Sequence, residues 1–108
     1  QVMVILLRNA LDATKTVSDP QLEIILASGE TATLAIRDNG HGIEDLDAVF
    51  EPFYTTKQPG DGVGLGLAIS SGIVNDLGGR LLARNAEKGG AVFEMQLPIL
   101  NDQTQAAE

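Results

Sequence analysis

The chain has 108 residues, of which 44% are hydrophobic and 20% charged, the balance typical of one soluble globular domain. Its net charge of −8 argues against a nucleic-acid-binding function, because such proteins usually neutralise phosphates with a basic face. The sequence has no cysteine, which excludes a disulfide framework and a thiolate metal site, and its one histidine, His41, cannot build a zinc site alone.

The first half of the chain predicts a helix and a hairpin. Apolar residues recur with a 3.6-residue period over residues 1–17, which predicts a helix that ends at Ser18-Asp19-Pro20. Two strands follow over residues 22–27 and 33–37, joined by a turn at 28–30. In the second strand, Leu34 and Ile36 are expected on one side, with Ala35 and Arg37 on the other.

The second half predicts a similar order after a long loop. Residues 44–50 are expected to form a short helical turn, and residues 51–64 a mobile loop rich in glycine and proline. A helix is predicted over residues 65–77 and ends at Gly78-Gly79. A second hairpin follows, with strands over 80–85 and 91–98.

This order of elements predicts the fold class. Helix, hairpin, loop, helix and hairpin favour an α/β two-layer sandwich, with a mixed, mainly antiparallel sheet covered on one face by helices. We expect one domain over residues 1–100 and a polar tail over 101–108. Because Gln1 stands directly against an apolar run and is not Met, we expect the sequence to be part of a larger protein. No apolar run approaches the length of a membrane span, so this part is not expected to insert into a membrane.

Glycines at every second position, from Gly60 to Gly66, lead into the second helix. Glycine lets backbone N–H groups approach a ligand closely, and a helix N-terminus attracts anions. Taken alone, the run fits a surface loop as well as a phosphate site. It lacks the Gly-Lys-Ser/Thr ending of a P-loop, and no strand directly precedes it as in a dinucleotide-binding turn.

Two polar residues are candidate ligands for a nucleotide. Asp38 ends a predicted strand, and its carboxylate can accept a hydrogen bond from an exocyclic amine, although Asp-Asn-Gly is also a common turn. Asn9 lies mid-helix, where its carbonyl oxygen suits magnesium, although a solvent-facing asparagine is the simpler interpretation. Lys57 can pair with phosphate or remain solvated in its loop.

The order of these groups resembles a known family, the ATP-binding catalytic domain of sensor histidine kinases in the GHKL ATPase superfamily. Residues 6–10 resemble its N box, 38–42 its first glycine box, 50–57 its F box, 62–67 its second glycine box and 89–93 its last. The resemblance extends from residue 1 to about 98, and the F box with the segment that follows it is most similar to the dicarboxylate-transport type of sensor kinase.

The resemblance implies a role for each matched position. Asp38 would bind the adenine amine, Gly40 and Gly42 would shape the adenine pocket, and Asn9 would hold magnesium against the phosphates. Lys57 would lie near the phosphates, and the second glycine box would form the ATP lid and its hinge. The expected cofactor-binding residues are Asn9, Asp12, Asp38, Gly40, Gly42, Ile43, Phe53, Thr56, Lys57, Gly62, Val63, Gly64, Leu65, Gly66 and Leu67.

The implied activity is binding of ATP with Mg²⁺ and donation of the γ-phosphoryl group to a histidine on a dimerisation and phosphoacceptor domain absent from this sequence. A response regulator receiver domain would then accept the group. The resemblance implies a cytoplasmic domain, allows anchorage of a homodimeric parent in the bacterial inner membrane, and predicts little activity for the isolated fragment. Residues 54–64 are expected to be poorly ordered without nucleotide.

The sequence departs from the family pattern in three places. Ile5 stands where the N box commonly has asparagine, Ala91 where a threonine is common, and Leu77 where a histidine is often found. Two alternatives remain open. Another GHKL ATPase would need a carboxylate base on the first helix, where Ile5 stands, and a degenerate interaction module would tolerate both Ile5 and Ala91.

Overall fold

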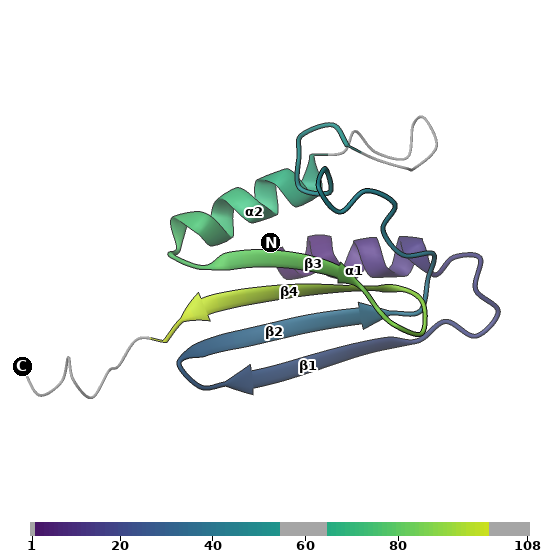
Figure 1. The fold of residues 1–108 in the computed structure, drawn as a ribbon, viewed down its shortest axis with the longest axis horizontal. Helices are drawn as coiled ribbons and strands as arrows, with labels where there is room; N and C mark the ends of the chain where they lie inside the picture. The colour runs from purple at the N-terminus through teal and green to yellow at the C-terminus, as the bar shows by residue number, and fades with distance from the viewer. Residues whose placement is uncertain (1, 55–64, 100–108) are drawn as a thin grey trace, which may run out of the picture.

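The computed structural model describes residues 2–54 and 65–99, which form two helices and four strands (Figure 1). The elements in chain order are α1 (Val2–Ala13), β1 (Leu22–Ser28), β2 (Thr31–Asp38), α2 (Gly66–Asp76), β3 (Arg80–Asn85) and β4 (Ala91–Pro98). The predicted order of helix, hairpin, helix and hairpin is confirmed. Within the described residues, neither helix is long and apolar enough to cross a bilayer.

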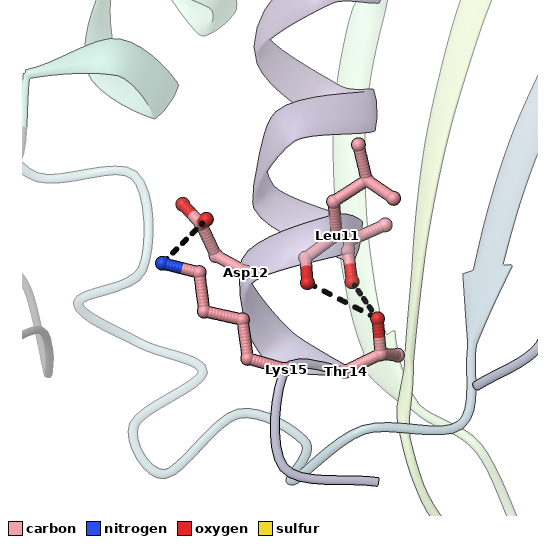
Figure 2. Close-up of polar contacts among 5 residues, drawn as sticks. Leu11, Asp12, Thr14 and Lys15 are labelled. Carbon is pink, nitrogen blue, oxygen red and sulfur yellow. Dashed lines mark hydrogen bonds and ion pairs between the residues drawn. The ribbon is translucent and has the colours of Figure 1, made fainter. Parts of the chain in front are cut away.

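Helix α1 buries one stripe of its surface and ends earlier than its sequence period predicts. Val2, Leu6 and Ala10, spaced by four residues, are its buried positions. The helix stops at Ala13 because the next residue, Thr14, turns its hydroxyl back onto the last turn. Its Oγ1 donates to the carbonyl oxygens of Ala10 and Leu11 at 3.0 and 3.1 Å, the same two oxygens to which the Thr14 amide bonds (Figure 2).

The four strands form one sheet in the order β1-β2-β4-β3, and all three described pairs are antiparallel. The expectation allowed a mixed sheet, whereas the described strands contain no parallel pair. The two hairpins join through β2 and β4, which place Ile36 opposite Phe93 and Arg37 opposite Val92. This non-local pairing brings the end of β2 next to the start of β4.

The core lies between the sheet and the two helices, as the two-layer sandwich predicts. Its fully buried members include Leu6 from α1, Ile36 from β2 and Val74 from α2. Phe50 and Phe93 meet edge to face, with ring centroids 6.2 Å apart and an interplanar angle of 77°. Contacts of α1 with β2, of α2 with β3 and between the helices hold the layers together.

The segment that follows β2, residues 39–54, contains no regular helix but is anchored to the core. Residues 44–50 form successive turns, in which the amide of Ala48 bonds to the Asp45 carbonyl and that of Glu51 to the Ala48 carbonyl. Val49 is buried, with 5% of its surface exposed, whereas Leu46 is 45% exposed. The expected helical turn is therefore present as turns that pin Val49 and Phe50 to the core.

Candidate functional site

Asp38 is the most buried charged side chain of the site and is held by one of its two oxygens. It ends β2 and exposes only 2% of its surface. Its Oδ1 accepts the amide of Gly40 at 2.9 Å and the amide of Ala91, 53 residues away, at 3.3 Å. Among residues 2–54 and 65–99, Oδ2 has no hydrogen-bond partner. One oxygen thus orients the carboxylate, and the other remains for a donor on a ligand.

Two glycines allow the backbone to close tightly around Asp38. A Cβ atom on Gly40 would overlap the backbone carbonyl of Ala13, at the end of α1. A Cβ atom on Gly90, whose φ is +91°, would overlap the backbone carbonyl of Asp38. The end of α1, the segment after β2 and the turn before β4 therefore meet at Asp38, and only residues without a side chain permit that approach.

The loop after Gly40 is fixed by a side chain from the second hairpin. Asn85, the last residue of β3, accepts the amide of Ile43 with its Oδ1 at 2.6 Å and donates its Nδ2 to the Ile43 carbonyl at 3.0 Å. Gly42 precedes this contact with φ of +81°, and a Cβ atom there would lie 2.9 Å from Asn85 Oδ1. The sequence motifs do not include Asn85, because an asparagine between a strand and a turn is ordinary.

Replacing Asn85 by alanine removes both hydrogen bonds to Ile43 while leaving the strand ladder intact. We expect the free energy of unfolding to fall by about 1–2 kcal/mol, since each exposed hydrogen bond contributes little net stability. The larger effect is local: amide hydrogen exchange at Ile43 should become faster than in the unmodified chain. Asn75→Ala, on exposed α2, is the matched control, and unchanged exchange at Ile43 in Asn85→Ala would contradict the role of this contact.

Helix α1 contributes Asn9 and Asp12, whose side chains differ in their partners. Asn9 is half-buried, and its amide makes no hydrogen bond within the described part of the chain. Asp12 forms an ion pair with Lys15, with 3.4 Å between its Oδ1 and Lys15 Nζ (Figure 2). Asn9 therefore has an uncommitted carbonyl oxygen, whereas the Asp12 carboxylate already has a cation beside it.

The start of α2 lies against α1 at Ile5. A Cβ atom on Gly66 would lie 3.2 Å from Ile5 Cγ2, so the first residue of α2 and the half-buried Ile5 are in close contact. Leu65, at the N-cap position, provides no side-chain hydrogen bond to the helix. Leu65, Gly66 and Leu67 are all half-buried. The first amides of α2 are thus without a side-chain cap, a setting that suits an anionic group.

The remaining predicted site residues are only partly within the described chain. Phe53 is 71% exposed with φ of +68°, a strained conformation for an aromatic residue. Thr56, Lys57, Gly62, Val63 and Gly64 lie outside the described residues. Residues 55–64 as a whole also lie outside them, so the expectation that segment 54–64 is poorly ordered without nucleotide stays a prediction.

The side chains that could bind a metal ion limit the kind of metal site that the described residues can form. No group of three or more histidine, cysteine, aspartate or glutamate side chains gathers among the described residues. That excludes a cation cage built of such side chains within those residues. Mg²⁺ is commonly held by one or two protein oxygens together with substrate phosphates and water, and the free amide oxygen of Asn9 fits that arrangement.

A folded sheet with helices on one face, and a buried carboxylate among glycines at one end of it, define a class of nucleotide-binding domain. The model of the histidine kinase-, DNA gyrase B- and HSP90-like ATPases matches residues 1–101, and the chain belongs to this family. The resemblance inferred from the ordered boxes is confirmed.

Several curated proteins similar to this chain are sensor kinases. The C4-dicarboxylate transport sensor protein DctB of Pseudomonas aeruginosa is 43% identical over 101 residues, which cover 90% of this chain and 16% of that protein. The sensor histidine kinase ZraS of Salmonella typhimurium is 34% identical over 102 residues, or 93% of this chain and 22% of that one. The chain thus spans less than a quarter of the length of these relatives.

Solved structures agree with the sequence relatives. The catalytic domain of histidine kinase ThkA superposes with a TM-score of 0.76 at 31% identity, covering 91% of this chain and 64% of that one. The mycobacterial sensor histidine kinase MprB gives a TM-score of 0.77 at 28% identity, covering 90% of this chain and 69% of that one. The expected sandwich fold is therefore that of histidine kinase catalytic domains.

Proposed function

We propose that this chain is the catalytic domain of a two-component sensor histidine kinase, which binds ATP with Mg²⁺ and donates its γ-phosphoryl group to a histidine on another domain. The observation that carries the proposal is the geometry of Asp38. A buried carboxylate with one oxygen held by two backbone amides and the other free is suited to accept an N–H group of adenine. Gly40, Gly42 and Ile43 form the backbone beside it.

The phosphate groups of the nucleotide would lie between α1 and α2. Asn9 would hold Mg²⁺, which when bound neutralises charge on the phosphates. The uncapped amides at Gly66 and Leu67 would face the phosphates. Phosphoryl transfer needs mainly positioning and charge neutralisation, so no covalent chemistry by the protein is required. Asp12, Phe53, Thr56, Lys57, Gly62, Val63, Gly64 and Leu65 complete the proposed set of nucleotide-contacting residues.

The proposed acceptor and partners lie outside this chain. His41 follows Gly40 within the first glycine box, where its Nδ1 lies 2.7 Å from the Gly42 carbonyl, and we do not propose it as the phosphorylated residue. The acceptor would be a histidine on a dimerisation domain of a homodimeric parent, and a response regulator receiver domain would accept the group next. The domain would act in the cytoplasm, at the inner face of a membrane that anchors its parent.

Ile5 argues against hydrolysis as the main activity. A hydrolytic ATPase of the same superfamily would need a carboxylate near this point of α1 to activate water. Ile5 carries no proton acceptor and is packed against Gly66. The arrangement therefore favours transfer to an acceptor domain over release of free phosphate.

Titration of the chain with ATP by calorimetry, with and without Mg²⁺, tests the proposal. We expect saturable binding that is tighter with Mg²⁺, and little phosphate release over hours. Absence of saturable binding at about 1 mM ATP, the weak end of ordinary nucleotide affinities, would contradict a catalytic role and favour an interaction module. Steady phosphate release by the isolated chain would favour a hydrolytic ATPase instead.

A further inference from the structure

The face of the sheet that points away from the helices carries a basic hollow at one end. The hollow has a volume of about 250 Å³ and is lined by Arg37, Arg84, Ala86, Glu87, Lys88 and Val92. Three of the seven basic residues of the sequence line it, together with one acidic residue. A chain with a net charge of −8 thus concentrates positive charge at one place, which we call the basic hollow.

The sheet register explains why these cations gather. Arg37 of β2 and Arg84 of β3 are both direct cross-strand partners of Val92 in β4. Cross-strand partners project from the same face, so Arg37 and Arg84 flank Val92, with their backbones about 10 Å apart at two strand spacings. Val92 is only 3% exposed and forms an apolar floor, and the turn that carries Lys88 closes the end.

The cations of the hollow are largely without carboxylate partners. Arg37 is 3.9 Å from Glu23 of the neighbouring strand, at the outer limit of an ion pair, and both side chains are well exposed. Within residues 2–54 and 65–99, neither Arg84 nor Lys88 takes part in an ion pair. Glu87 lines the hollow, and Glu94 lies on the next row of β4, where its carboxylate accepts a hydrogen bond from Gln96. The residues that line the hollow thus carry three positive charges and one negative charge, while Glu23 and Glu94 lie beside it.

We propose that the basic hollow docks an acidic segment of a partner protein, with carboxylate side chains held by Arg37, Arg84 and Lys88. Charge complementarity selects this occupant. Two guanidinium forks on either side of an apolar floor suit carboxylates carried on a polypeptide, whose aliphatic stems can contact Val92. The hollow opens on the sheet face opposite the helices, whereas the proposed nucleotide site lies on the helix side. Docking there leaves the nucleotide site accessible.

The test measures binding of a fluorescent octa-aspartate peptide to the chain at low salt. We expect saturable binding that weakens with added salt, and a loss of roughly fivefold to tenfold in affinity for the double substitution Arg84→Gln, Lys88→Gln. Arg80→Gln is the matched control for the substitution Arg84→Gln. It alters charge by the same amount on the same face of the same strand, about 13 Å away, and should leave peptide affinity within about twofold.

Three outcomes would overturn the proposal. They are no saturable peptide binding, equal losses for Arg84→Gln and Arg80→Gln, or inorganic phosphate bound as tightly as the peptide at the same residues. Circular dichroism confirms that each variant remains folded. ATP affinity, measured on the same samples, should not change in Arg84→Gln, so failure of the docking proposal and failure of the nucleotide proposal are distinguishable.

Discussion

Replacing Asp38 by asparagine is expected to reduce adenine-nucleotide affinity by about 10- to 100-fold while leaving the fold intact. The side chain keeps its size and can still accept the amides of Gly40 and Ala91 through Oδ1. Its second position then carries an NH₂ group, a donor that faces the donor of the ligand. A hydrogen bond to a charged group contributes about 1.5–3 kcal/mol, which corresponds to the expected loss. Calorimetric titration with ATP measures it.

Asp38→Ala separates the binding role of the carboxylate from its structural role. Alanine leaves the buried amides of Gly40 and Ala91 without their acceptor, so the free energy of unfolding should also fall by about 1–3 kcal/mol. Asp76→Asn, at the exposed end of α2, is the charge-matched control and should change neither quantity. Unchanged ATP affinity in Asp38→Asn would contradict the proposed contact with adenine.

Replacing Gly90 by alanine is expected to destabilise the chain more than the same change at its neighbour. The new Cβ atom would overlap the backbone carbonyl of Asp38, which cannot move without disturbing β2. We expect the free energy of unfolding to fall by about 3 kcal/mol or more, from the left-handed φ of +91° combined with overpacking. Urea unfolding monitored by circular dichroism measures the change.

Gly89 provides a close control for this prediction. Its φ is +100°, but a Cβ atom there would meet nothing within 4 Å among the described residues. In Gly89→Ala the free energy of unfolding should therefore fall only by the cost of placing alanine at a left-handed φ, about 1–2 kcal/mol. The Gly90 variant should in addition bind ATP more weakly, because its Cβ atom displaces the end of β2. Equal losses of stability in the two variants would show that the close approach to Asp38 is unimportant.

Local sequence patterns predicted the elements to within a few residues. Periodicity of 3.6 located both helices, and alternation located Leu34 and Ile36 on the core side of β2. The largest difference is the end of α1, predicted near residue 17 and observed at Ala13. The hydroxyl of Thr14 bonds to the last helical carbonyls, a local competition that an apolar period does not report.

The candidate site was predicted less completely than the fold. The ordered boxes indicated Asp38 and its glycines, but gave a different reason for Gly40: the structure shows it permitting contact with the backbone of Ala13. Asn85 and the basic hollow carried no sequence signal. The proposed roles of the residues between 55 and 64 depend on a segment outside the described chain.

Composition and periodicity, which depend on neighbours within a few residues, were enough to determine the class of fold, and the order of the boxes was enough to determine the family. The tertiary structure alone decided which distant groups meet. Pairing of β2 with β4 brings the amide of Ala91 to Asp38, and pairing of β3 with β4 brings Arg84 to the same row as Arg37. The hydrogen bond from Ala91 to Asp38 spans 53 residues, and no local period encodes a partner at that distance.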